Sequence, residues 1–375
     1  MENMEYLGFS NIYKNKKVLI TGHTGFKGSW LVTWLTMMGA KVVGISEKVP
    51  TNPSLFKLLK IEDRITHYFE DIRNKEQIDK IINDEKPDFL FHLAAQPIVS
   101  LSYQDPLDTI STNIMGTANI LDSLRNTDFK CTVVVVTSDK CYDNVEWFWG
   151  YKETDHLGGK DIYSGSKGGA ELISKSYYHS FFKKKDSKIR LATVRAGNII
   201  GGGDWALDRI VPDLIRAWNA NKKLIIRSPK ATRPWQHVLD PLSGYLLVGE
   251  KLYENIELNG DAFNFGPRHE INKPVIELVE DLAKIWNFKY PEDSYEILGN
   301  KSFDEASLLK LNCDKSLIQL KWLPVLYYNE FIDFTGKWYH EHRDNPENLL
   351  NYTENQIIEY CKLAKERELE WMKKD

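Results

Sequence analysis

The sequence has few cysteines and no long apolar run. Its four cysteines show no CxxC spacing and no neighbouring histidine; they are Cys131, Cys141, Cys313 and Cys361. This pattern is not that of a zinc site, so we expect no metal, and it fits a reducing compartment better than secretion. No stretch approaches the roughly 20 apolar residues that a membrane-spanning helix needs. Residues 1–10 contain Glu2 and Glu5 and no apolar segment of a signal peptide. We therefore predict a cytoplasmic protein without a membrane partner.

An excess of positive charge is also missing. The chain has 49 Lys and Arg against 53 Asp and Glu, a formal net charge of −4, which excludes a general nucleic-acid binder. The run Lys183-Lys184-Lys185 lies between two apolar segments and is interpreted as a solvated loop. Internal repeats and low-complexity segments are absent from the sequence. The length of 375 residues predicts two domains or one domain with a large appendage.

Short apolar runs alternate with helical patterns in the first half of the chain. The runs are rich in β-branched residues and apolar on both faces, which is typical of parallel strands covered by helices on both sides. The strand candidates are Val18–Ile20, Val42–Ile45, Phe89–Leu93, Val133–Val136 and Leu191–Val194. Their alternation with helices predicts an α/β fold built on a doubly wound parallel (Rossmann) sheet.

The pattern changes after Gly197, where Pro, Trp, Gly and Arg become dense over residues 201–241. A strand-like segment follows at 263–265, then a helix over 273–286. A charged amphipathic helix is expected over 354–371, with Glu368 interrupting its apolar stripe. We predict a Rossmann domain over residues 1–194 and a smaller α/β substrate domain over 195–375. The two are expected to be interleaved, with a segment near 235–267 returning to the first domain.

Three glycines with GxxGxxG spacing, Gly22, Gly25 and Gly28, connect the first strand to the first helix. Glycines at these places permit a tight turn and let backbone amides approach a pyrophosphate. A lone glycine triplet is a weak signal, but the strand–turn–helix context favours a dinucleotide site over a plain turn.

The ends of the second and third strands give a mixed indication of which dinucleotide binds. Ser46 is followed by Glu47 and Lys48, so no clear acidic residue marks the ribose position that would favour NAD over NADP. Asp71 follows the expected third strand. It either contacts the adenine or caps the helix that begins near Lys75.

Tyr163 and Lys167 lie four residues apart on an expected helix, hence on one face. A nearby ammonium group would lower the phenol's pKa from about 10 and make Tyr163 a usable general base. The strand over 133–136 delivers Thr137–Lys140 to the carboxyl edge of the sheet, where ligands bind in such folds. These polar residues either act on a ligand or merely cap the strand. Tyr163 downstream favours the first interpretation.

Six segments resemble the extended short-chain dehydrogenase/reductase superfamily and, within it, the nucleotide-sugar 4,6-dehydratases that act on CDP-glucose. The segments are TGHTGFKGSWL (21–31), HLAAQPIV (92–99), TSDKCYDN (137–144), YSGSKGGAEL (163–172), RAGNIIGGGDWALDRIVPD (195–213) and RPWQHVLDPLSGYLL (233–247). They cover most of residues 17–267. The C-terminal third matches mainly in length and helical character.

The resemblance implies an NAD-dependent lyase that oxidises the sugar at C4, eliminates water across C5 and C6, and returns hydride to C6. Ser138, Tyr163 and Lys167 would form the hydride-transfer triad. Asp139 would donate a proton to the departing 6-hydroxyl, and neutral Lys140 would take the C5 proton. Related dehydratases carry Asp-Glu where this chain has Asp139-Lys140. That departure fits the CDP-glucose subgroup and leaves the identity of the C5 base open.

The resemblance also implies two sets of binding residues. NAD would contact Gly22, His23, Thr24, Gly25, Phe26, Lys27, Gly28, Asp71, Ile72, Leu93, Ala94, Ala95, Asn113, Tyr163 and Lys167. The nucleotide sugar would contact Gln96, Ser138, Asn198, Arg209, Arg233 and His237. The two arginines are candidates because a guanidinium group matches phosphate oxygens, although each could instead form a surface ion pair. Trp205 and Trp235 would either flank the base or serve as core anchors.

Superfamily members usually pair helices into a four-helix bundle, which implies a homodimer or homotetramer. The helices that hold Asn113 and Tyr163 would supply it, with Asn113 also supporting the active-site helix. Two other functions compete with CDP-glucose dehydration. One is a dehydratase or epimerase for another nucleotide sugar. The other is a non-catalytic NAD-binding regulator, which would have no need of an intact Ser138, Tyr163 and Lys167.

Overall fold

Seven parallel strands form the centre of the protein in a computed structural model that describes residues 6–268, 271–298 and 308–373. The strand order is β11-β6-β5-β4-β1-β2-β3. The strands are β1 (Lys17–Thr21), β2 (Lys41–Ser46), β3 (Thr66–Phe69), β4 (Phe89–His92), β5 (Cys131–Val136), β6 (Ile189–Ala196) and β11 (Ala262–Phe265). All of their pairings are parallel. This is the order of a doubly wound sheet, so the predicted fold class is confirmed.

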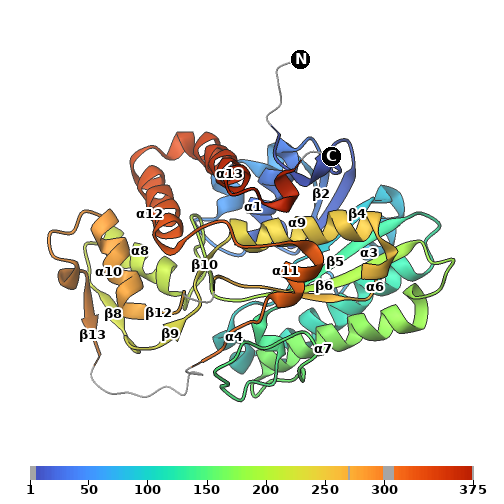
Figure 1. Cartoon of the computed structure of the whole chain (residues 1–375), viewed down its shortest axis with the longest axis horizontal. Helices are drawn as coiled ribbons and strands as arrows, with labels where there is room; N and C mark the ends of the chain where they lie inside the picture. The colour runs from blue at the N-terminus through green and yellow to red at the C-terminus, as the bar shows by residue number, and fades with distance from the viewer. Residues whose placement is uncertain (1–5, 269–270, 299–307, 374–375) are drawn as a thin grey trace.

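Helices cover both faces of the sheet (Figure 1). One layer consists of α3 (Lys75–Glu85), α6 (Gly116–Arg125) and α7 (Ile162–Tyr177), and the other of α1 (Phe26–Met37), α9 (Leu239–Glu254) and α13 (Leu349–Glu366). Because side chains alternate along a strand, β1 supplies both cores: Val18 and Ile20 pack with the α1 layer, and Leu19 packs with the α6 layer. The apolar runs in the sequence are therefore strands buried on both sides.

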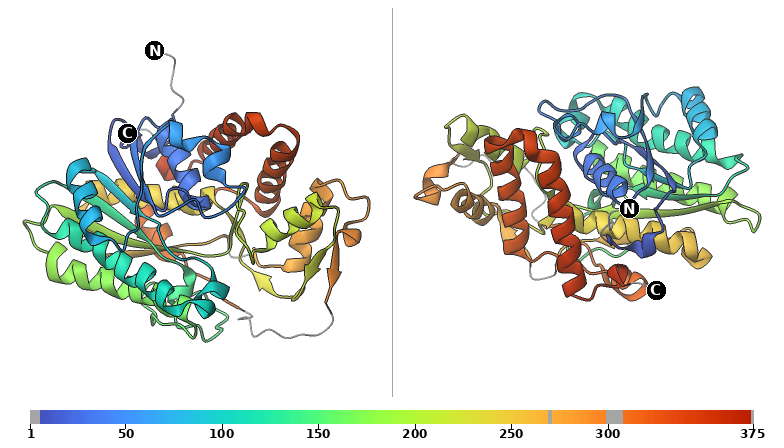
Figure 2. Two further views of the ribbon diagram at one scale, coloured as in Figure 1. Left: turned by 180° about the vertical axis from the view of Figure 1, so that it is seen from behind. Right: turned by 90° about the horizontal axis from the view of Figure 1, so that it is seen from above.

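A second group of elements lies beside the sheet, seen at the left of Figure 1 and from two other sides in Figure 2. Its helices are α8 (Ile210–Asn219), α10 (Val275–Ile285) and α12 (Tyr328–Asp344). Its two-stranded sheets pair β8 (Leu224–Ile226) with β13 (Tyr295–Ile297) and β9 (Thr232–Arg233) with β12 (Lys273–Pro274). A further pair, β7 (Ile199–Ile200) with β10 (Gln236–His237), connects this group to the sheet.

Short elements complete the described chain. The short α-helices are α2 (Leu55–Leu58), α4 (Val99–Gln104), α5 (Pro106–Ile110) and α11 (Asp314–Leu320). Two π-helical turns are η3 (Ser111–Met115) and η5 (Tyr178–Phe182). The 3-10 turns are η1 (Phe9–Asn11), η2 (Ile61–Asp63), η4 (Asp139–Cys141), η6 (Ile256–Leu258), η7 (Pro291–Ser294), η8 (Pro346–Asn348) and η9 (Glu370–Met372).

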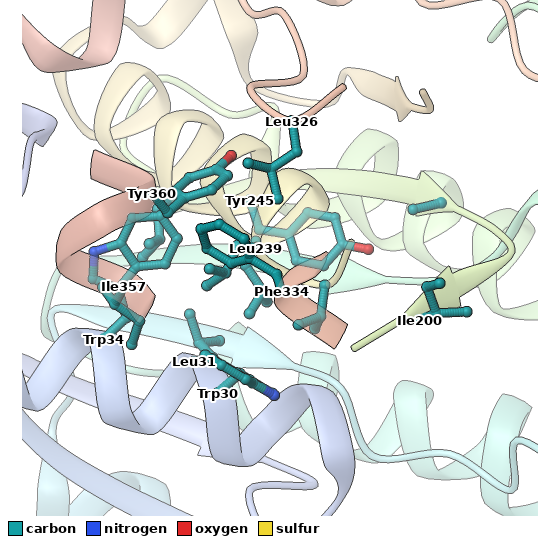
Figure 3. Packing of buried hydrophobic residues seen from close by; sticks show 14 of the residues in the cluster. Trp30, Leu31, Trp34, Ile200, Leu239, Tyr245, Leu326, Phe334, Ile357 and Tyr360 are labelled. Atoms are coloured by element: carbon teal, nitrogen blue, oxygen red, sulfur yellow. The ribbon is translucent and has the colours of Figure 1, made fainter. Parts of the chain in front are cut away.

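The chain returns to the sheet twice after β6. Helix α9 packs on β5 and β6, and β11 adds the edge strand beside β6. The last helix then packs on α1, where Ile357 and Tyr360 of α13 share one core cluster with Trp34 of α1 (Figure 3). The boundary at residue 194 between two functional domains stays a prediction.

The predicted C-terminal helix was wrong at both ends. It begins at Leu349 and ends at Glu366, because Glu368 adopts a left-handed backbone (φ 54°) that terminates an α-helix. Trp371 lies in η9, where its ring stacks on Phe9 with centroids 4.9 Å apart. The helix predicted over 273–286 is α10, Val275–Ile285. Among the described residues, no helix has the length and apolarity that a membrane crossing requires.

Candidate active site

The glycine turn after β1 lets neighbouring backbone segments approach it closely. Gly22 has φ 76°, and a Cβ there would lie 2.7 Å from the Ala94 backbone nitrogen. A Cβ on Gly28 would lie 2.2 Å from the Gly22 oxygen, so the helix presses directly on the turn. Helix α1 has Gly25 as its N-cap and no side-chain cap. Its first-turn N–H groups therefore remain free to bind an anion, which fits the pyrophosphate of a dinucleotide.

The side chains within this turn stabilise its shape. His23 is fully buried, and its Nδ1 lies 2.9 Å from the Ser46 hydroxyl. Burial lowers the pKa of His23 to about 4, so the ring is neutral. The Thr24 hydroxyl donates to the Lys48 carbonyl at 2.7 Å. Contacts of these two residues with NAD would therefore come chiefly from their backbone.

Asp71 follows β3, as expected, and its carboxylate accepts hydrogen bonds from the Arg73 backbone N–H and Nε, each at 2.8 Å. The cap of α3 is Asn74, which accepts from the Gln77 N–H. The alternative that Asp71 caps this helix is therefore wrong. Its contact with the adenine stays a prediction, as does that of Ile72, whose side chain lies against the backbone of Gly116 on α6.

Tyr163 and Lys167 lie on one face near the start of α7, both buried, with the ammonium 6.0 Å from the ring centroid. Burial raises the pKa of Tyr163 to about 12, against a lowering by the Ser138 hydroxyl. Burial also lowers the pKa of Lys167 to about 8. The expectation of a lowered phenol pKa is wrong, because the loss of solvation outweighs the lowering by the Ser138 hydroxyl and the charge of Arg209.

The turn η4 places Asp139 and Lys140 at the end of β5. The Ser138 hydroxyl donates to Asp139 Oδ1 at 2.9 Å. The carboxyl group lies directly over Gly197, where a Cβ would be only 1.9 Å from Asp139 Oδ2. The half-buried Lys140 amine makes no hydrogen bond or ion pair with any residue in the described part of the chain. This edge of the sheet therefore carries a carboxyl group fixed by its contacts and an amine that a ligand can contact.

Asn113 lies in the π-helical turn η3 and connects two neighbouring segments. Its Nδ2 donates to the Ser166 hydroxyl of α7 at 2.8 Å, and its Oδ1 accepts from the Gln96 N–H at 2.8 Å. The Gln96 side chain folds into its own loop, bonding to Ile98 and Thr109. Gln96 therefore offers no unused amide group to a substrate in this conformation. Leu93 and Ala94 meet the β1 turn through hydrogen bonds to Thr21, and Ala95 follows them in the same loop.

Lys27 and Arg209 lie near Tyr163 and Lys167. Burial, followed by the charges of Lys167 and Arg209, lowers the pKa of Lys27 to about 7. Arg209 is the N-cap residue of α8 and binds Asp204 at 2.8 Å, and its charge also acts on Tyr163. Lys27, Lys167 and Arg209 gathered at one edge, with Arg209 paired to Asp204, are suited to bind phosphate groups.

The structure does not bring every predicted residue to this edge. His237 is fully buried between Trp30 and Phe334, and burial lowers its pKa to about 3, which does not favour direct contact with a sugar. Arg233 lies on β9, where it donates to the Thr232 carbonyl, and Asn198 adopts a left-handed backbone next to β7. Their contacts with substrate stay predictions. Trp205 and Trp235 are both buried, in agreement with the core-anchor alternative.

Sequence reasoning missed Glu171 and Arg195, which form a buried ion pair beneath the catalytic groups. The available signal was the spacing of Tyr163, Lys167 and Glu171, which repeats every four residues on α7. Within the described residues, no group of His, Cys, Asp and Glu side chains is arranged to hold a metal ion.

A Rossmann sheet with a glycine turn after its first strand, and a tyrosine–lysine pair at its carboxyl edge, define a dinucleotide-dependent enzyme of the short-chain dehydrogenase type. The chain belongs to the GDP-mannose 4,6 dehydratase family, whose sequence model matches residues 19–289. The resemblance identified in the sequence and the prediction of an enzyme are thereby confirmed.

Individual relatives of the chain are also 4,6-dehydratases. The chain is 44% identical to "CDP-glucose 4,6-dehydratase" of Salmonella typhimurium over 93% of this chain and 97% of that protein. It is 24% identical to "dTDP-glucose 4,6-dehydratase" of Haemophilus influenzae over 86% and 97% of the two chains. Among solved structures, a dTDP-glucose 4,6-dehydratase from Streptomyces venezuelae, with NAD and TYD bound, has a TM-score of 0.74. That match covers 87% of this chain and 98% of the other at 20% identity, and it supports the fold.

Proposed function

We propose that this chain converts CDP-glucose to CDP-4-dehydro-6-deoxyglucose with NAD as its bound cofactor. The observation that carries the proposal is that one sheet edge holds both an alcohol-oxidising pair and an acid–amine pair. The first is Tyr163 with Lys167, and the second is Asp139 with Lys140. Oxidation alone, or epimerisation through a 4-ketone, needs only the first pair. The 44% identity with the Salmonella enzyme supports CDP-glucose as the substrate.

The cofactor would be held by the turn from Gly22 to Gly28, the loop from Leu93 to Ala95, and Asp71, Ile72, Asn113, Tyr163 and Lys167. The uncapped start of α1 fits its pyrophosphate. When bound, NAD supplies an acceptor for the hydride from C4 and a donor for its return to C6. The half-buried Lys27 adds a positive charge at the same helix start.

The reaction steps follow from the placement of the protein's own groups. With a pKa of about 12, Tyr163 reacts through a phenolate that is its minor form. That phenolate takes the proton of the 4-hydroxyl, and the protonated Lys167 stabilises it. Lys140, as neutral amine, removes the C5 proton that the 4-ketone acidifies, and Asp139 protonates the departing 6-hydroxyl so that water leaves. Lys140 then returns a proton to C5. Ser138, hydrogen-bonded to Asp139 and beside Tyr163, offers a path by which the proton from Tyr163 restores Asp139.

The substrate's diphosphate would bind Arg209 and Arg233. Ser138, Asn198, Gln96 and His237 are the other proposed substrate contacts. Arg209 is the best supported of these, because its charge acts on Tyr163 and its position at the start of α8 borders the catalytic edge. Gln96 and His237 have the weakest support, since the Gln96 amide is hydrogen-bonded to Thr109 and the His237 ring is fully buried.

Assembly and location belong to the same proposal. Large apolar side chains are exposed on the helices around Asn113 and Tyr163, namely Tyr103, Leu107, Met115 and Leu172, each more than half exposed. A four-helix bundle between two copies would cover them, giving a homodimer or, with a second interface, a homotetramer. We place the protein in the cytoplasm, where nucleotide sugars are made.

The test is incubation of the purified protein with CDP-, GDP-, dTDP- and UDP-glucose and GDP-mannose. With CDP-glucose we expect a product lighter by one water and no net release of reduced cofactor. Stoichiometric accumulation of reduced cofactor without a dehydrated product would identify an ordinary dehydrogenase. Faster dehydration of another nucleotide sugar would change the assigned substrate and leave the reaction type intact.

A further inference from the structure

Glu171 and Arg195 form a bidentate ion pair beneath the catalytic residues. Glu171 Oε1 accepts from Arg195 Nε at 2.8 Å and Oε2 accepts from Arg195 Nη2 at 2.9 Å, with both side chains 3% exposed. Although burial raises the pKa of Glu171, the guanidinium and two hydroxyl donors lower it below its ordinary value, so the carboxylate is charged. A fork of this kind fixes direction as well as distance.

The same ion pair holds both ends of the segment that carries Ser138–Lys140. On one side, the Thr137 hydroxyl donates to Glu171 Oε1 at 2.5 Å. On the other side, Arg195 Nη1 donates to the Tyr142 hydroxyl at 2.6 Å. The turn between these two anchors, η4, is three residues long. Backbone hydrogen bonds also hold this segment, from Thr137 N–H to the Val194 carbonyl and from Gly158 N–H to the Cys141 carbonyl. The two anchors are the side-chain contacts that connect its ends to the ion pair.

Glu171 also connects this segment to the hydride-transfer pair. It follows Lys167 by four residues and Tyr163 by eight, which puts all three on one face of α7. The pKa of Lys167 is lowered by burial, and the negative charge of Glu171 opposes that lowering. One carboxylate therefore contacts the strand end that carries the proposed elimination groups and, together with Cys141, opposes the lowering of the Lys167 pKa.

The contacts continue to the edge strand of the central sheet. The Tyr142 hydroxyl donates to Asn264 Oδ1 on β11 at 2.8 Å, and the Asn264 carbonyl accepts from the Ser316 hydroxyl on α11 at 2.6 Å. Tyr142, Asn264 and Ser316 are all buried. This line of hydrogen bonds gives the anchor at Tyr142 a rigid support on its far side.

We propose that Glu171 and Arg195 are positioning residues that hold Asp139 and Lys140 in register with Tyr163 and Lys167. Neither residue of the ion pair reaches the reacting atoms, and both act through Thr137 and Tyr142. The inference rests on the proposed dehydratase function, since it assigns oxidation to α7 and elimination to η4. Displacing this segment should therefore slow elimination more than oxidation, which it affects only through the contact of Ser138 with Tyr163.

The experiment removes one anchoring hydroxyl at a time and follows the two half-reactions in a single turnover with CDP-glucose. Thr137→Val should slow formation of dehydrated product by about tenfold, equivalent to about 1.4 kcal/mol, while cofactor reduction changes little. Thr137→Ser keeps the hydroxyl and should restore product formation. Tyr142→Phe should act in the same direction as Thr137→Val. Thr353→Val is the matched control, because it removes a buried threonine hydroxyl on α13 that binds Trp338, far along the chain from the ion pair.

A pH profile provides a second readout. Glu171→Gln removes the charge that keeps the pKa of Lys167 up, so the alkaline limb of kcat should move to lower pH. If that variant does not fold, the Thr137 and Tyr142 variants still test the positioning role of the ion pair. A Thr137→Val enzyme with a lowered melting temperature but the wild-type ratio of cofactor reduction to product formation would overturn the proposal. Equal slowing of both half-reactions would overturn it too.

Wild-type dehydration is measured first, so that the two hypotheses fail separately. If the wild type dehydrates a different nucleotide sugar from the panel, the assigned substrate is wrong and the same variants are compared with that sugar. The positioning role of Glu171 and Arg195 is then tested by the same ratio of cofactor reduction to product formation.

Discussion

Helix α7 and the turn η4 carry the two halves of the proposed chemistry, and the protein holds them in different ways. α7 is 16 residues long, is capped by Asp161 and presents Tyr163 and Lys167 from its own hydrogen-bonded backbone. η4 has three residues, and its position depends on side chains of neighbouring elements. The difference teaches that a reactive group on a long helix needs few partners. One on a short turn takes its precision from contacts made by residues outside that turn.

The two segments also differ in what surrounds their reactive groups. Tyr163 and Lys167 are both buried, and burial moves their pKa values apart, raising that of Tyr163 to about 12 and lowering that of Lys167 to about 8. On η4, Asp139 is buried against Gly197 while Lys140 is half-buried. Three of the four proposed reactive groups are thus enclosed, and Lys140 alone among them is more open to a ligand.

The largest effect is expected at the helix. Tyr163→Phe removes the general base and should lower turnover by at least about a hundredfold, within the usual range for such catalysis. Both half-reactions should be lost together, because elimination requires the 4-ketone. Melting temperature and cofactor content should stay near those of the wild type, since the ring is kept. Near-normal turnover would remove Tyr163 from the mechanism.

A change at the turn should separate the halves. Lys140→Met keeps the apolar stem and removes the amine, so product formation should fall by about a hundredfold. Solvent deuterium should no longer enter C5, as measured by NMR of the recovered sugar. Reduction of the cofactor should continue. Deuterium exchange at C5 at the wild-type rate would transfer the base role to another group.

A somewhat smaller loss is expected at Asp139, because water can replace a missing acid in part. Asp139→Asn keeps the shape over Gly197 and removes the transferable proton. In a single turnover, reduced cofactor should accumulate while dehydrated product is delayed by about tenfold or more. The structural alternative, that Asp139 only caps the strand, predicts a lower melting temperature with an unchanged ratio of the two signals.

A still smaller effect, on binding only, is expected at α1. The pKa of Lys27 is about 7 in the protein without ligands, so a bound phosphate group should raise it and cause uptake of part of a proton at pH 7.5. Calorimetry in buffers of different ionisation enthalpy would measure this for NAD. Lys27→Met should abolish the uptake and weaken binding by about tenfold, a typical value for one coupling interaction of about 1.4 kcal/mol. Lys14→Met, at an exposed position, is the control.

The smallest effect on activity is expected at α9, which carries neither half of the chemistry. Asp240 accepts from the Val325 N–H at 2.7 Å and the Tyr360 hydroxyl at 2.9 Å, and burial raises its pKa to about 7. The folded state then binds a proton more tightly than the unfolded state between about pH 4 and 7. Stability should therefore fall as pH rises through that window, by at most about 1.4 kcal/mol per pH unit.

Asp240→Asn should flatten this dependence and leave the ratio of the half-reactions unchanged. Urea titrations at pH 5 and pH 7.5 would measure the first effect, and single-turnover data the second. A change in the ratio of cofactor reduction to product formation would show that α9 also affects the chemistry that we assign to α7 and η4.

The sequence was sufficient to predict the buried strands and the proximity of Tyr163 and Lys167, for a physical reason; the roles of the reactive residues stay predictions. β1 and β5 are buried on both faces, so their apolar runs are visible without any partner. The Tyr163–Lys167 pair is local, and helical spacing predicts it. The end of the last helix was missed because the left-handed conformation of Glu368 depends on the docking of Trp371.

Interactions between distant residues could not be predicted from one sequence. Glu171 and Arg195 are separated by a helix end and a strand, and Asp240 and Tyr360 by 120 residues. The phenol pKa was expected to fall because the cation was visible in the sequence and the burial was not. A single sequence does not give the solvent exposure of a side chain, and here burial shifts the pKa of Tyr163 more than the neighbouring charges do.

The packing of α13 and η9 on the first helix has a consequence for how the chain folds. Cys361 contacts the Leu7 carbonyl, and Trp371 stacks on Phe9 and lies edge-on to Trp34. The outer side of α1 and the segment around Phe9 therefore stay uncovered during synthesis until these late residues leave the ribosome. Long-range closure of this kind slows folding and leaves apolar surface open to chaperones or aggregation. Removing residues 349–372 should accordingly reduce the yield of folded protein before it affects any catalytic group.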